Sequence, residues 1–279
     1  MTYSMTDEQR FTFDLKGWLM IPSVLQPDEI REIKEFLDAL EFNPETLPER
    51  DRHVCGGACS QLLDHPVVVG VLNEIILSPG SLRDGDVPAD AGDEAKPYGF
   101  RCDGWHLARR TYDPNRSASD APPSPPHNGG VEMYPTHSFN VFNGRISSPV
   151  TRVVWEVNPV KKWMGGTLFM SGSHKSNFTI PPEHRQTDSP LYETYGCPAG
   201  TVLFFSESVC HGGPHWLDPE HDRMALFFHY MHASSKWHYG APPHETVMAM
   251  PPKRRSLFRG VWMGVGQTND EYSKENRAI

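Results

Sequence analysis

The chain has 279 residues, a formal net charge of −9 at pH 7 and 38% hydrophobic residues. These values fit one large globular domain, or a domain with insertions, that can bury a sizeable core. The acidic balance, without a basic stripe, argues against nucleic acid as the main partner. No apolar run approaches the roughly 20 residues of a membrane span, so we expect no membrane partner. We find no secretion signal, and the five scattered cysteines fit reduced thiols in the cytoplasm.

The N-terminal part of the chain shows helical signals. Thr6 and Gln9 form a capping box, which predicts a helix over residues 7–16 that ends at Gly17. The apolar run 18–21 then predicts a short buried strand. A second helix is predicted to begin at Pro27, because acidic residues follow it and apolar residues then recur at helical spacing.

A third helix is predicted over 64–77, and from Tyr98 onward the pattern changes to short apolar runs between turns, which is typical of a β sandwich or barrel. The predicted strands cover residues 98–107, 150–157, 167–171, 201–206 and 223–232. Residues 78–96 are predicted to be a loop, and the Pro-rich segment 115–130 a mobile loop over a pocket. We therefore expect a mainly β protein with flanking helices: helices within about 7–77, a β core over about 98–238 and a C-terminal extension over 239–279.

A histidine and an arginine stand on either side of the turn before the last predicted strand. His211 precedes two glycines, and Arg223 opens the apolar run 224–230 about a dozen residues later. A neutral imidazole can bind a metal, and an arginine can hold a carboxylate through two parallel hydrogen bonds. A non-haem iron site with a 2-oxo acid co-substrate needs both. We therefore predict that His211 is a metal ligand and that Arg223 binds the co-substrate.

Two further motifs carry a family resemblance. Residues 165–175 read Gly-Gly-Thr-Leu-Phe-Met-Ser-Gly-Ser-His-Lys, and residues 17–25 read Gly-Trp-Leu-Met-Ile-Pro-Ser-Val-Leu, before a Pro-Asp-Glu-Ile helix start. With His211 and Arg223, these motifs resemble the phytanoyl-CoA dioxygenase family, from about residue 6 to about residue 238. The resemblance implies a single domain with a double-stranded β-helix (jelly-roll, cupin-like) core. It also implies an Fe(II)/2-oxoglutarate-dependent dioxygenase, with His174 in a structural turn.

The His-x-Asp pair that such enzymes use does not occur before this Gly-Ser-His turn. Two histidines are candidates for the proximal ligand. His106 is followed by Ala108 where the carboxylate would stand, and His137 is followed by Phe139 at that position. Alanine leaves room beside a metal and phenylalanine does not, which favours His106.

An alanine at the carboxylate position leaves three alternatives open. A halide could take the position, a carboxylate such as Asp103 or Glu132 could replace it, or the site could bind metal poorly and serve another role. We expect a dioxygenase that hydroxylates a small organic substrate. The alternatives are a halogenase-like variant and a non-catalytic or differently metallated β-helix that binds a small molecule. The sequence carries no signal for an oligomeric state.

Overall fold

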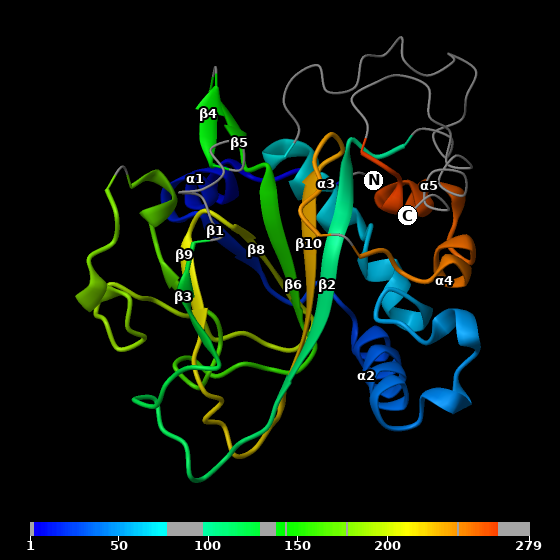
Figure 1. Ribbon diagram of the computed structural model, residues 1–279, viewed down its shortest axis with the longest axis horizontal. Helices are drawn as coiled ribbons and strands as arrows, with labels where there is room; N and C mark the ends of the chain where they lie inside the picture. Colours follow the sequence, from blue (N-terminus) through cyan, green and yellow to red (C-terminus); the bar gives the residue numbers. More distant parts are fainter. Residues whose placement is uncertain are drawn as a thin grey trace.

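The computed structural model describes residues 3–76, 97–128, 138–142, 144–176, 178–238 and 240–261. Two antiparallel sheets form its centre, one with the order β1-β8-β6-β10-β2 and one with the order β3-β9-β7 (Figure 1). The larger sheet consists of β1 (Trp18–Ile21), β2 (Phe100–Arg110), β6 (Val150–Glu156), β8 (Thr201–Ser206) and β10 (Arg223–His232). The smaller sheet consists of β3 (Ser124–His127), β7 (Leu168–Met170) and β9 (Cys210–Gly213), and β4 (Asn140–Phe142) pairs separately with β5 (Arg145–Ser147).

The helices precede and follow the strands in the chain. They are α1 (Asp7–Lys16), α2 (Pro27–Phe42), α3 (Pro66–Ile75), α4 (His244–Met248) and α5 (Pro252–Arg255). Short 3₁₀ helices are η1 (Pro44–Thr46), η2 (Glu49–Asp51), η3 (Gly57–Leu62), η6 (Ser173–Lys175), η7 (Pro182–His184) and η8 (Ser256–Phe258). None of the helices in the described ranges is long and apolar enough to cross a membrane.

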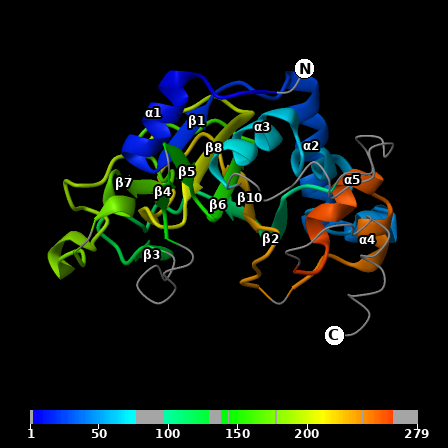
Figure 2. The same ribbon diagram turned by 90° about the horizontal axis from the view of Figure 1, so that it is seen from above.

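The larger sheet has two different faces. Helices α2 to α5 lie on one side of it, and the smaller sheet lies on the other side (Figures 1 and 2). On β10, Leu226 and Phe228 pack into the core beneath the helices, whereas Ala225 belongs to the core between the sheets. Because side chains alternate along a strand, odd-numbered positions of β10 face the smaller sheet. This inner face carries the candidate site.

Most of the predicted elements are confirmed. The helix at 7–16 has the expected capping box and a left-handed Gly17 at its end, and β6, β7, β8 and β10 lie where the sequence indicated strands. The prediction of a loop throughout 115–130 is wrong at Ser124–His127, which is a strand paired with β9. β9 itself was not predicted as a strand. The predicted loop 78–96 and the candidate His137 lie outside the described residues.

Candidate metal centre

Two histidines and one glutamate converge between the two sheets. His127 ends β3, His211 lies on β9, and Glu207 follows β8; the ligand atoms of the three all lie within 4.8 Å of one another. Pairing of β3 with β9 sets His127 opposite His211, and their ring centroids are 4.3 Å apart. Strand pairing therefore brings together ligands that are far apart in the sequence.

Both imidazoles are held in the same orientation. His211 Nδ1 lies 2.8 Å from the carbonyl oxygen of Val209, and His127 Nδ1 lies 2.8 Å from that of Pro125. Nδ1–H of each ring can therefore donate to the main chain, which leaves Nε2 free to face a metal. Burial lowers the pKa of His211 to about 4, so this ring is neutral at neutral pH.

Glu207 is a buried carboxylate with one oxygen already paired. Its Oε2 accepts from Arg152 Nε at 2.6 Å, and its Oε1 lies 3.9 Å from His211 Nε2. Burial alone would raise the pKa of Glu207, but the charge and hydrogen bond of Arg152, together with the neighbouring histidines, outweigh it and hold this pKa well below the usual range. Two neutral imidazoles and one ionised carboxylate are the donor set of non-haem iron sites. The residues present therefore fit a divalent iron ion.

The two histidines of this group line a cavity of about 170 Å³, and Glu207 lies behind them, outside the lining. Its lining includes His127, His211, His106, Ala108, Arg110, Arg152, Thr167, Phe205, Phe227 and Arg223. This volume is below the roughly 300–1,000 Å³ typical of sites for drug-sized ligands. It suits a metal ion with a small oxo acid.

Arg223, the predicted co-substrate residue, lies in this cavity wall but already holds a carboxylate. Its Nη2 and Nε donate to the two oxygens of Glu156 at 2.5 and 3.3 Å, and Nη2 also reaches Thr167 and Tyr195. Burial would lower the pKa of Arg223, but the charge and hydrogen bond of Glu156, together with Tyr195, outweigh it and raise this pKa. No pattern in the sequence indicates Glu156 as its partner.

Arg110 lies directly opposite Arg223 in the β2–β10 pairing and is less completely paired than Arg223. Its Nη1 donates to the carbonyl oxygen of Pro214 at 2.8 Å. It has no carboxylate partner within the described ranges. Burial, with the charge of Arg223 next to it, lowers the pKa of Arg110 to about 10. An incoming carboxylate would relieve this repulsion.

His106, the preferred proximal candidate, lines the same cavity but does not join the group of three ligands. Its ring stacks on Phe227 with centroids 4.5 Å apart, and burial lowers its pKa to about 4. Ala108 lies two residues further along β2 in the same lining. His174 is buried and its Nε2 lies 3.0 Å from the carbonyl oxygen of Asp14, as expected of a structural histidine.

The sequence patterns considered above do not single out His127 or Glu207. His127-Asn128-Gly129 nevertheless resembles His106-Leu107-Ala108, because a small residue stands two positions after the histidine. Applying the reasoning used for Ala108 to Gly129 would have included it. Glu207, four residues before His211, carries no motif of its own.

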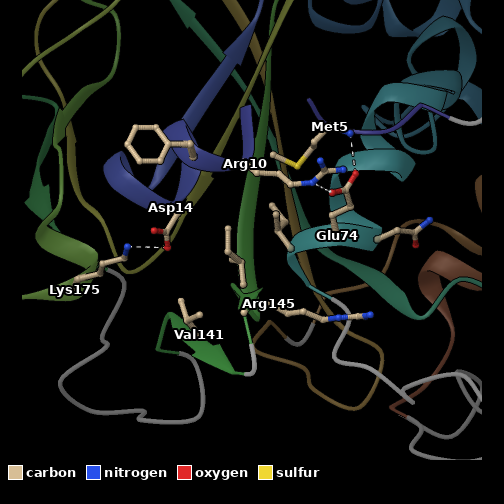
Figure 3. A pocket seen from close by; sticks show the side chains of 12 residues that line it. Met5, Arg10, Asp14, Glu74, Val141, Arg145 and Lys175 are labelled. Carbon is tan, nitrogen blue, oxygen red and sulfur yellow. Dashed lines mark hydrogen bonds and ion pairs between the residues drawn. The ribbon is translucent and has the colours of Figure 1, made fainter. Parts of the chain in front are cut away.

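A larger cavity of about 600 Å³ lies on another part of the surface, between α1, the end of α3 and the β4–β5 hairpin (Figure 3). Four of its charged side chains form two ion pairs: Arg10 with Glu74 at 2.6 Å, and Lys175 with Asp14 at 2.7 Å. No group of potential metal ligands among the described residues lies in its lining. The smaller cavity is therefore the better candidate for chemistry.

No protein-family model matches the chain, and no curated protein matches it. Solved structures share its fold. HygX from Streptomyces hygroscopicus with iron bound has 18% sequence identity and a TM-score of 0.60, over 97% of this chain and 100% of that chain. HygX with nickel, 2-oxoglutarate and hygromycin B bound has 18% identity and a TM-score of 0.59, over 96% and 100%.

The epimerase SnoN in complex with Fe³⁺, alpha-ketoglutarate and nogalamycin RO also aligns, with 14% identity and a TM-score of 0.54 over 82% of this chain and 84% of that chain. At these identities the comparisons establish the fold. Proteins with this fold bind iron and 2-oxoglutarate, which agrees with the cofactor and co-substrate predicted from the sequence.

Proposed function

We propose that this protein is an Fe(II)/2-oxoglutarate-dependent oxygenase with a double-stranded β-helix core of the phytanoyl-CoA dioxygenase type. The observation that carries the proposal is the convergence of His127, His211 and Glu207. The two histidines line a cavity that also contains three arginines, Arg110, Arg152 and Arg223. The iron- and 2-oxoglutarate-bound neighbours support the proposal. In this assignment His127 replaces His106 and His137 as the proximal ligand.

The missing His-x-Asp carboxylate is supplied from another segment. Gly129 stands where the aspartate of a His-x-Asp pair would be, and it offers no ligand. Glu207 provides the carboxylate instead, with Oε1 directed to His211 and Oε2 fixed by Arg152. This is the second of the three alternatives that the sequence left open. A halogenase-like site needs a ligand position without a carboxylate, so Glu207 favours the oxygenase.

Arg110 and Arg223 together provide the positive end of the co-substrate site. When bound, iron and 2-oxoglutarate supply the oxidising chemistry, in which the oxo acid loses CO₂ and O₂ is activated. Glu156 holds Arg223 rigid, and Arg110 offers donors that no described carboxylate uses. We therefore assign the far carboxylate of 2-oxoglutarate to Arg110, with Arg223 beside it.

The prime substrate is proposed to be a small organic molecule. HygX and SnoN were solved with hygromycin B and nogalamycin RO respectively, which supports a small-molecule substrate. The cavity of about 170 Å³ accommodates the metal and the oxo acid, so the substrate must bind at its mouth. Whether the outcome is hydroxylation or another oxidation depends on which C–H bond the mouth presents.

The test is 2-oxoglutarate turnover by purified protein with Fe(II) and O₂, followed as succinate formation. Many such enzymes release some succinate without their prime substrate, so a slow, iron-dependent rate is the expected result. Glu207→Gln should lower both iron affinity and this rate. If protein loaded with iron binds no 2-oxoglutarate by calorimetry, the oxygenase proposal fails and the non-catalytic binding protein is preferred. A rate that requires halide and is unaffected in Glu207→Gln would favour the halogenase-like variant.

A further inference from the structure

A second group of two histidines and one carboxylate lies outside the lining of the 170 Å³ cavity. Asp103 on β2, His229 on β10 and His238 after β10 each place one ligand atom within 4.8 Å of the others. His229 Nδ1 lies 3.1 Å from His238 Nδ1, and His238 Nδ1 lies 3.1 Å from Asp103 Oδ2. Three potential donors therefore face one point.

A β-bulge positions the carboxylate of this group. In the β2–β10 pairing His229 is opposite Gly104 and Tyr230 is opposite Cys102, so Asp103 has no partner on β10. Bulges of this kind redirect a side chain and are frequent beside functional sites. Here Asp103 Oδ2 accepts from the main-chain N–H groups of two consecutive residues, Trp237 and His238, both at 2.8 Å. The bulge thus fixes the segment that carries His238.

Gly104 makes room for the second histidine. A Cβ at this position would lie 3.1 Å from His238 Nδ1, which is closer than most side chains tolerate. The absence of a side chain on β2 therefore allows the His238 ring to approach His229. The His229 residue is only 1% exposed, whereas the His238 side chain is 42% exposed and leaves a path for an ion from solvent.

Hydrogen bonds alone do not satisfy all three ligand atoms of Asp103, His229 and His238. Nδ1–H of His238 can donate to Asp103, and Nδ1 of His229 then faces an atom that already carries its only proton. His238 Nδ1 therefore has one proton for two neighbouring acceptors, His229 Nδ1 and Asp103 Oδ2. Metal–ligand bonds of about 2.0–2.1 Å place neighbouring ligand atoms about 2.9–3.4 Å apart in octahedral or tetrahedral geometry. The two observed separations fall in this range.

We propose that Asp103, His229 and His238 form a second metal site, which takes a divalent transition ion of the zinc class. Two nitrogen donors favour such an ion over Mg²⁺ or Ca²⁺, which prefer oxygen ligands. Arg101 pairs with Asp103 Oδ1 at 3.3 Å, and its charge reduces the affinity for any cation. Asp103 Oδ2, which also accepts the two main-chain N–H groups, is the oxygen next to the His238 ring. The open side at His238 gives water the remaining coordination positions. This site does not depend on the proposed oxygenase activity.

The experiment uses the full chain, freed of metal, and titrates it with Zn²⁺ alone. His211→Ala removes the group in the cavity and should still bind one zinc equivalent. His211→Ala/His238→Gln should bind none, and His211→Ala/Asp103→Asn should bind at least ten-fold more weakly. Asparagine still accepts the N–H groups of Trp237 and His238, so this variant preserves the loop while it loses the charge. Circular dichroism confirms that each variant is folded.

The matched control is His211→Ala/His244→Gln, because His244 is an exposed histidine outside both groups described above. It should bind zinc as His211→Ala does. The proposal is overturned if His211→Ala binds no zinc, or if its zinc affinity is unchanged by both Asp103→Asn and His238→Gln. Loss of iron-dependent turnover in His211→Ala concerns the first site only, so failure of one proposal is distinguishable from failure of the other.

Discussion

Two charged groups face the same side of β6, four residues apart, and differ in how completely they are paired. At Glu156 both carboxylate oxygens receive hydrogen bonds from Arg223, and the hydroxyl of Tyr195 donates to Oε1 at 2.5 Å. At Arg152 only one oxygen of Glu207 is paired. The Nε2 atoms of His211 and His127 have no hydrogen-bond partner in the described part of the chain.

This difference separates a structural group from a ligand-binding group. A buried ion pair whose partners are fully hydrogen-bonded has little left to offer a ligand, and loss of one partner leaves the other charge unpaired. A group with unpaired lone pairs is suited to bind a cation. The Glu156–Arg223 group should therefore contribute mainly to stability, and the group around Glu207 mainly to metal affinity.

The largest expected effect is on stability, at the fully hydrogen-bonded Glu156–Arg223 pair. Arg223→Ala leaves the ionised Glu156 buried without its partner, so we expect a loss of about 3–5 kcal/mol in the free energy of unfolding. Denaturant unfolding followed by circular dichroism measures it. A double variant, Arg223→Met with Glu156→Gln, should recover much of this loss. An Arg223→Ala protein as stable as wild type would show that the pair is not a structural unit.

The next largest effect is on metal binding, at the group formed by His127, His211 and Glu207. His127→Ala or His211→Ala should each lower iron affinity more than 100-fold, beyond the 10–100-fold typical of changes to residues that only orient a ligand. His106→Ala is the matched control from the same cavity and should retain iron. Iron content after dialysis against a weak chelator measures this. Retention by His127→Ala together with loss in His106→Ala would restore the ligand predicted from the sequence.

A smaller effect distinguishes the two arginines. Arg110→Ala removes charge-assisted hydrogen bonds worth about 1.5–3 kcal/mol, so the KM for 2-oxoglutarate should rise about 10- to 100-fold. Its unfolding free energy should change by less than about 1 kcal/mol, because no described carboxylate loses its partner. Arg223→Lys should instead lower the free energy of unfolding and change the KM for 2-oxoglutarate little. Unchanged oxo-acid affinity in Arg110→Ala would leave Arg223 as the anchor.

The smallest effect is a pH dependence of stability caused by His106, which lines the same cavity as His211 and Arg223. Its folded pKa of about 4 lies below the unfolded value of 6.5, so the unfolded chain binds more protons between these pH values. Stability should therefore fall as the pH is lowered from 6.5 towards 4. His106 is partly open to solvent, which limits its share to about 1 kcal/mol or less. His106→Phe, which can still stack on Phe227, should lose less stability than wild type between pH 7 and pH 5.

The helices and most strands of the larger sheet could be predicted because their signals are local. The capping box of Thr6 and Gln9 and the apolar run of β10 depend on neighbours in the sequence. His211 was found for the same reason, since glycines follow it directly and Arg223 comes soon after. β3 was missed because Ser124-Pro125-Pro126-His127 has the composition of a loop. It is an edge strand of the smaller sheet, where a proline without an N–H group is tolerated.

The sequence by itself determined the first three helices, the strands of the larger sheet, and the histidine and arginine on either side of the turn before β10. Only the tertiary structure decided which histidine faces His211, because the β3–β9 pairing, not spacing along the chain, makes His127 and His211 neighbours. It also decided that Arg223 is held by Glu156 and that the carboxylate of Glu207 lies close to both histidines. These are contacts between segments distant in the sequence, and their energies depend on burial that no local pattern records.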